Sequence, residues 1–209
     1  MISVHLIQRA FELQDTERLL RLVNQNGLEL PLPLQIRLLA GPVAPLALAL
    51  SRLMDLTYGH TPLGRDMAAA ILAHQQADGA FEAGGEPDPL ATAAAAAAMG
   101  RLMRESAVPW PELVAARQRA LAALGELQGD DSLFCCPHDR TQADRALIGA
   151  FILVLLGDDA DFRQAVRYAD LLTWFDEHAR RLEPATHKLY RLASLGRAAR
   201  NAHQPAAAA

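Results

Sequence analysis

The most reactive side chains of this protein stand together in the segment Phe-Cys-Cys-Pro-His-Asp, residues 134–139. The segment brings two thiols, an imidazole and a carboxylate within six residues. Such groups bind metal ions when three or four of them converge on one point. The candidate ligands are Cys135, Cys136, His138 and Asp139. The alternative interpretation is a polar loop between helices, in which one cysteine is buried as a small hydrophobic residue.

Three further polar residues stand beside apolar segments. His74 follows an apolar run and could act as a general base facing an inner cavity, although capping a helix end is the simpler role. Asp88 precedes an alanine-rich segment and is expected to cap that helix, with Thr92 bonding back to the backbone. Contact of Asp88 and Thr92 with a ligand is the alternative. Trp110 and Trp174 are expected to be packing anchors.

The elements that would carry these residues are helices. The chain has 209 residues, of which 51% are hydrophobic and 21% charged, a composition typical of globular domains. Sustained period-two alternation is absent, and proline and glycine punctuate the segments, which predicts an all-α domain of antiparallel helix pairs. We expect short helices before residue 45. Longer helices are expected at 45–57, 62–76, 88–104, 111–128, 141–156, 161–182 and 186–201.

The predicted helices alternate in polarity. In 111–128 the apolar residues form one stripe, and Arg117 and Arg119 are expected outside it, on the exposed side. Segments 89–100 and 146–156 have no polar face, so they must be covered all round. Their small side chains allow neighbouring helices to approach closely. The alternation therefore predicts two layers, an outer row of half-exposed helices and an inner row of buried ones.

A unit of about 53 residues occurs twice in the chain. Superposing Phe81 on Phe134 aligns Gln75 with Gln128, and each unit reads as helix, Gln, Asp turn, Phe, polar loop and apolar helix. The Gln would bond carbonyl groups at a helix end, a glycine would permit a tight reversal, and the Phe would fill the groove between helices. A third copy at 24–30 is a much weaker match.

In these two units the chain resembles the α/α-toroid repeats of squalene–hopene cyclases and protein prenyltransferase β-subunits. Gln-Gln-Ala-Asp-Gly-Ala-Phe, residues 75–81, looks like the Gln-x-x-x-Gly-aromatic signature of those repeats. Residues 88–99 look like the Asp-x-x-x-Thr-Ala start of their inner helix. The match covers 62–156. It implies an incomplete α/α-toroid-like fold, with antiparallel helix pairs in two layers.

The resemblance also implies chemistry. Prenyltransferases hold zinc with Asp, Cys and His near the starts of inner helices, and residues 134–139 occupy a comparable place, with His74 or Asp144 as the remaining ligand. The cyclases protonate their substrate with Asp-x-Asp-Asp, whereas this chain has Asp-Asp-Ala-Asp at 158–161. Aromatic residues make up only 5% of the chain, few for a cavity that stabilises carbocations. We therefore expect no cofactor, with zinc as the alternative.

These features predict one all-helical domain over residues 1–202, followed by a disordered tail at 203–209. Within the domain, 1–60 would hold the N-terminal helices, 62–156 the two repeats and 161–201 the C-terminal helices. We expect a non-catalytic module that binds an apolar small molecule or a protein segment in its concave centre. A small enzyme that uses the Cys-Cys-Pro-His-Asp loop is the alternative.

Charge, hydropathy and the cysteine pattern limit the partners and the cellular location that we expect for the protein. A net charge of −4 gives no reason to expect nucleic acid as a partner. The longest apolar run is well short of the roughly twenty residues that cross a membrane. No secretory signal is visible, and two adjacent cysteines make a disulfide framework implausible. The expected location is the cytoplasm, and the sequence leaves the oligomeric state open.

Overall fold

The computed structural model describes residues 4–24, 30–106, 110–135 and 141–203, with 197–203 described by their backbone alone. This part of the chain is all-α, as predicted, apart from one two-stranded hairpin. Its helices are α1 (Val4–Glu12), α2 (Thr16–Asn24), α3 (Leu32–Leu38), α4 (Val43–Asp55), α5 (Pro62–Leu72), α6 (Pro89–Glu105), α7 (Pro111–Glu126), α8 (Gln142–Leu156), α9 (Ala160–Ala165), α10 (Tyr168–His178) and α11 (Pro184–His203). A 3-10 turn, η1 (Ala179–Arg181), follows α10. Most of the weak third repeat and of the predicted tail lies outside the described residues.

Side-chain caps set the starts of the inner helices. The Asp88 carboxylate accepts a hydrogen bond of 2.7 Å from the backbone N–H of Ala91 at the start of α6. Fifty-three residues later, Thr141 and Asp144 form a reciprocal capping box at the start of α8. Both caps satisfy backbone donors that the first turn of a helix leaves unpaired. The predicted capping role of Asp88 is confirmed.

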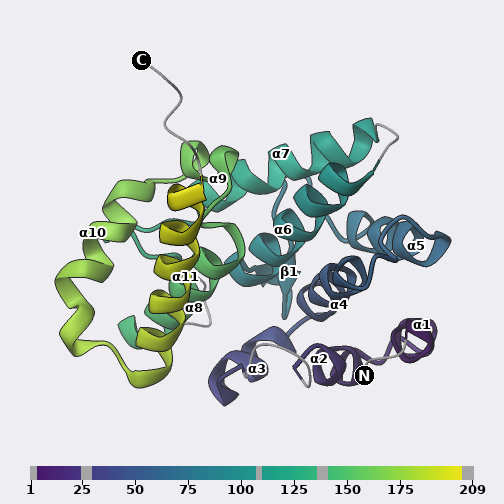
Figure 1. The fold of residues 1–209 in the computed structure, drawn as a ribbon, viewed down its shortest axis with the longest axis horizontal. Helices are drawn as coiled ribbons and strands as arrows, with labels where there is room; N and C mark the ends of the chain where they lie inside the picture. The colour runs from purple at the N-terminus through teal and green to yellow at the C-terminus, as the bar shows by residue number, and fades with distance from the viewer. Residues whose placement is uncertain (1–3, 25–29, 107–109, 136–140, 204–209) are drawn as a thin grey trace.

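The described helices form an inner row and an outer row. In the inner row, α6 packs between α4 and α8. Figure 1 shows these three as an inner arc, with α5, α7, α9 and α10 along its outer side. Helix α5 packs on α4, and α7 packs along α6. Helices α2 and α11 cover the two ends of the inner row, α2 against α4 and α11 against α8.

The alanine-rich helix α6 is the centre of the core. Every residue in 89–100 is buried except Ala97, which is half-buried. In 146–156 of α8, only Val154 and Leu155 are half-buried rather than buried. The prediction that both segments are covered nearly all round is confirmed. Small side chains are required there because α6 has neighbours on three sides, namely α4, α7 and α8.

The two predicted repeat units have the same turn. Gln75 and Phe81 form an isolated antiparallel bridge, and so do Gln128 and Phe134. Both phenylalanines are fully buried. The reversal needs a positive φ, which is +93° at Gly79 and +68° at the equivalent Ser132. The predicted turn and the burial of the Phe are therefore confirmed in both units, whereas the glycine occurs only in the first. The Gln side chains bond carbonyls of their own turns, not carbonyls at a helix end as predicted.

Several predicted boundaries are wrong. The single helix expected at 161–182 is three pieces, α9, α10 and η1, because the chain becomes extended at Val166 and Arg167. The helix expected at 62–76 ends at Leu72, since residues 73–76 already belong to the turn. The loop expected at 80–87 contains the hairpin of β1 (Glu82–Ala83) and β2 (Glu86–Pro87). Gly84 and Gly85, with φ of +64° and +86°, make its tight turn.

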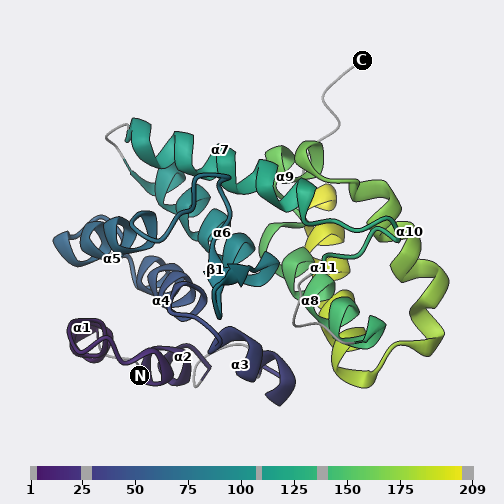
Figure 2. The same ribbon diagram turned by 180° about the vertical axis from the view of Figure 1, so that it is seen from behind.

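No single helix in the described ranges has both the length and the apolar composition to span a membrane. Helices α3 and α4 meet those criteria only when taken together, and they are bent by 104° relative to each other. Most of α4 is buried in the core of the fold (Figure 2).

We predict that bulk added inside α6 destabilises the fold. Ala95 and Ala96 are fully buried, so Ala95→Leu or Ala96→Leu should lower the free energy of unfolding by about 1–3 kcal/mol. Ala97→Leu is the matched control, because Ala97 is half-buried and its effect should stay within about 0.5 kcal/mol. Chemical denaturation followed by circular dichroism measures all three. Equal stabilities for the three variants would contradict the packing described for α6.

Candidate functional site

Asp88 and Thr92 are structural residues in the described fold. Their exposed fractions are 1% and 0%, so a ligand has no access to them. Arg37 of α3 donates a hydrogen bond of 2.9 Å to the Asp88 carboxylate. The Thr92 hydroxyl donates to the Asp88 carbonyl and accepts from the N–H of Phe81. Together these bonds fix the entry of α6 beneath α3, and the predicted back-bonding of Thr92 is confirmed.

His74 and Asp144 are exposed and lie at helix ends. His74 follows α5, and its backbone N–H donates to the carbonyl of Ile71 in the last turn of that helix. The Asp144 carboxylate accepts from the backbone N–H and the hydroxyl of Thr141. Because the Asp144 side chain is engaged in this capping box, the structure gives it the role of a cap. The exposed position of His74 after α5 is consistent with the simpler role at a helix end and not with the alternative of a base that faces an inner cavity.

Cys135 lies next to a positive charge. Its Sγ is 3.0 Å from a guanidinium nitrogen of Arg145, which also pairs with the Asp131 carboxylate. Burial alone would lower the pKa of Arg145, but the hydrogen bond to Cys135 and the charge of Asp131 raise it above its ordinary value. Arg145 therefore stays charged beside the thiol. A guanidinium in this position opposes a second cation on the same sulfur.

The other three candidate ligands of the cysteine loop, Cys136, His138 and Asp139, lie outside the described residues. Among the residues that the structure describes, no three His, Cys, Asp or Glu side chains are grouped so that they could hold a metal ion. The zinc hypothesis therefore depends on residues 136–139 and stays a prediction.

A groove opens where the inner helices α6 and α8 end. We call it the inner-helix groove, and its volume is about 620 Å³. Ala97 and Met103 of α6 line it, together with Val154 and Leu155 of α8. All four are half-buried, and three of them are the exceptions to burial in segments 89–100 and 146–156. Charged residues also line the groove, namely Arg104, Arg117, Asp158, Asp159 and Asp161.

An arginine that we expected on the exposed side of its helix is the centre of these charged residues. Arg117 of α7 is only 5% exposed and lies across Gly100 of α6, where a Cβ atom would approach its Nε to 2.5 Å. Its two terminal nitrogens donate to Asp161 and Asp159 at 2.6 and 2.5 Å. Burial alone would lower the pKa of Arg117, but these hydrogen bonds raise it above its ordinary value.

The Arg117 interaction was missed because an arginine outside an apolar stripe normally points to solvent. Two sequence features do mark it. Gly100 interrupts an otherwise alanine-rich helix, and Asp-Asp-Ala-Asp at 158–161 follows the next inner helix. In the fold, Asp159 also caps α9 by accepting from the N–H groups of Asp161 and Phe162. Asp159 and Asp161 thus bind the Arg117 guanidinium, and Asp159 also caps the first turn of α9.

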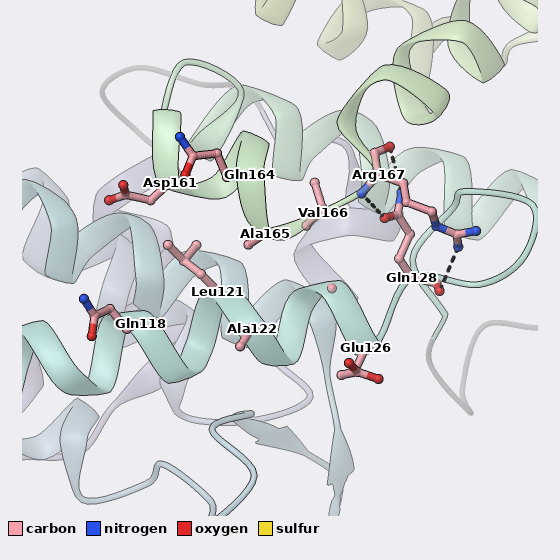
Figure 3. Close-up of a pocket in the computed structure, with 11 residues that line it drawn as sticks. Gln118, Leu121, Ala122, Glu126, Gln128, Asp161, Gln164, Ala165, Val166 and Arg167 are labelled. Atoms are coloured by element: carbon pink, nitrogen blue, oxygen red, sulfur yellow. Dashed lines mark hydrogen bonds between the residues drawn. The ribbon is translucent and has the colours of Figure 1, made fainter.

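A second groove, of about 740 Å³, lies on the outer row between α7 and α9. Figure 3 shows its polar lining, which includes Gln118, Gln164 and Arg167. At one end, the N–H of Arg167 donates to the side-chain oxygen of Gln128 at 2.7 Å. Gln128 also ties this end to its own turn by donating to the carbonyl of Ser132. At that end of the groove, Gln128 and Arg167 therefore have a structural role.

Comparisons of the chain with protein-family models, with curated proteins and with solved structures find no match. The fold and the side chains therefore define the class of protein, which is an all-α domain with two matching turns and surface grooves. Nearly all of the described polar residues that looked suited to chemistry act as caps or ion-pair partners. The arrangement is suited to binding.

We predict that Arg117 stabilises the fold far more than the exposed arginine that shares its carboxylate. Arg117→Gln removes the charge facing Asp159, which is 14% exposed, and should cost about 3 kcal/mol. Arg104→Gln is the matched control. Its side chain is 66% exposed and lies 3.8 Å from Asp159, so its loss should cost less than about 1 kcal/mol. Urea unfolding of the two variants gives the comparison, and similar losses would rule out a central role for Arg117.

We also predict that the purified protein carries metal well below one ion per chain. The physical reason is the Arg145 guanidinium, which already occupies the polar side of the Cys135 thiol. Elemental analysis should give substoichiometric zinc, and a chelator should leave the melting temperature unchanged. One zinc per chain, lost together with stability in Cys136→Ser and His138→Ala, would overturn this expectation and favour the enzyme hypothesis.

Proposed function

We propose that the protein is a non-catalytic helical-repeat module that binds a protein segment in the inner-helix groove. The observation that carries the proposal is the exposure pattern of the inner row. Helices α6 and α8 are buried along segments 89–100 and 146–156, except for side chains that line this one groove. Apolar surface that a fold leaves open beside polar groups is typical of an interaction site.

The composition of the groove favours a protein segment over a small apolar molecule. Pockets for small molecules bury most of the ligand and are lined mainly by apolar side chains. Here apolar side chains such as Met103 and Leu155 line the groove together with charged ones such as Arg104 and Asp159. A segment with apolar side chains on one face and charged or polar ones on the other would satisfy both kinds of side chain.

The site differs from the concave centre that we expected from the repeat resemblance. At the start of α6, Asp88 and Thr92 are buried, and Asp88 pairs with Arg37 of α3. The relation to the α/α-toroid repeats remains part of the proposal. It is supported by the matching turns at Gln75 and Gln128 and by the two rows of helices.

Photo-crosslinking tests the proposal directly. A benzophenone amino acid at Met103, inside the groove, should crosslink to a defined protein segment in extracts of the source cells. The same group at the exposed Glu112 of α7, which lines neither of the two grooves, serves as the position control. A synthetic peptide with the crosslinked sequence is then titrated against the purified protein. Crosslinks to a lipid or other small molecule would favour the small-ligand alternative, and equal crosslinking from both positions would contradict the groove.

We predict that a charge in place of an apolar side chain of the groove abolishes most of this binding. Leu155→Asp should weaken the peptide at least tenfold, because a buried leucine contributes about 1.5–3 kcal/mol. Leu195→Asp on α11 is the control, since Leu195 is 62% exposed and does not line the groove. Calorimetric titration measures both variants. If they bind the peptide with the same affinity, the segment does not occupy the inner-helix groove.

A further inference from the structure

A separate small cavity lies where α10, η1 and the starts of α8 and α11 meet. We call it the Trp174 cavity, and its volume is about 230 Å³. Figure 1 shows the beginnings of α8 and α11 side by side, near the chain that leaves α10. Gln142 comes from the first turn of α8 and Thr186 from the first turn of α11. The cavity is smaller than the roughly 300–1,000 Å³ of drug-sized sites, so it suits a small ligand.

An aromatic pair forms one wall of the cavity. The rings of Trp174 and His178 stack with their centroids 4.3 Å apart and an interplanar angle of 8°. The Nδ1 of His178 lies 2.8 Å from the carbonyl oxygen of Trp174, and because a carbonyl only accepts, Nδ1 carries the proton and donates. This bond fixes the orientation of the histidine ring. The pair therefore presents a fixed, flat surface suited to an apolar ligand body.

The charges around the cavity favour an anion. The N-terminus of each long helix carries a partial positive charge of about one half, and α8 and α11 both begin here. Arg181 adds a full positive charge, and no carboxylate among the described residues forms an ion pair with it. Glu183 also lines the cavity and offsets one charge. The Asp144 carboxylate caps α8 and offsets the partial charge at that helix start, so Arg181 and the start of α11 are the positive groups beside the cavity.

A buried hydroxyl provides an independent indication of a ligand. Thr186 lines the cavity and is only 2% exposed. Within the described residues its hydroxyl has no hydrogen-bond partner. The oxygen is not among the fully buried side-chain atoms that lack a partner, so it is accessible from the cavity. A ligand with an acceptor oxygen in the cavity would satisfy this hydroxyl.

We propose that the Trp174 cavity binds a small organic anion with an apolar body. The carboxylate or similar group of the ligand lies against the first turns of α8 and α11, beside Arg181 and the Thr186 hydroxyl. Its apolar body packs on Trp174 and on Leu182, which is also part of the lining. This site is independent of the inner-helix groove and of the function proposed for it.

Benzoate is the probe that tests this site. Trp110 and Trp174 are the two tryptophans of the chain, so a Trp110→Phe background makes the fluorescence report on Trp174 alone. Benzoate should quench this fluorescence saturably and at least tenfold more tightly than neutral benzyl alcohol or cationic benzylamine. Inorganic phosphate, which lacks an apolar body, should also bind at least tenfold more weakly. Absence of saturation below about 10 mM benzoate would overturn the proposal.

Charge variants provide the second part of the test. Arg181→Gln and Thr186→Val should each weaken benzoate binding about tenfold, whereas Glu183→Gln should tighten it by removing a repelling carboxylate. Arg180→Gln is the matched control, since Arg180 is the exposed neighbour that does not line the cavity. Circular dichroism shows which variants fold, and the exposed Arg181 keeps the test valid if Thr186→Val does not. Tighter binding of benzylamine than of benzoate, or equal effects at Arg180 and Arg181, would refute the anion site.

Discussion

The side-chain amide of a glutamine joins each repeat turn to a later helix of the outer row. Gln75 donates to the carbonyl of Gly79 in its own turn at 3.0 Å and to Ala116 of α7 at 2.7 Å. Gln128 makes the same bond to its own turn, and it exchanges hydrogen bonds with the backbone of Arg167 at the start of α10. Because one amide serves two carbonyl groups, the turn and that outer helix are positioned together. The position of each outer helix in turn determines which part of the inner row it covers.

The inner row can be rich in alanine because these turns hold its neighbours close. With α4, α7 and α8 all packed against α6, large side chains on α6 would have no room. The same crowding explains where charge is found. The Arg117 side chain passes over Gly100 because that position lacks a Cβ, and it reaches Asp159 and Asp161 at the end of the next inner helix. The polar groups at the ends of the inner helices therefore hold the rows together.

The sequence predicts features that depend on short-range patterns and fails where tertiary contacts decide. The Asp88 cap and the burial of 89–100 follow from residues close together in the chain, and the repeat is visible because each unit carries the same short pattern. The position of Arg117 follows from a glycine in one helix and carboxylates beyond another, which no periodicity within α7 reveals. The break at Val166 was missed for the same reason, since the backbone there is fixed by Gln128, from 39 residues earlier in the chain.

The packing of this fold also decides where binding is possible. In an array of helices, each residue on an inner helix is either covered by a neighbour or left at an end of the row. Here α4, α7 and α8 pack on α6, and α11 packs on α8, so the interior offers little open surface. Open surface is left where helices begin or end, and this is where both proposed sites lie. The end of α6 and α8 exposes apolar side chains beside paired charges, whereas Arg181 and the Thr186 hydroxyl, which have no partner among the described residues, line the cavity at the starts of α8 and α11. The direction of the helices thus gives the two sites opposite character, apolar at one end and anion-binding at the other.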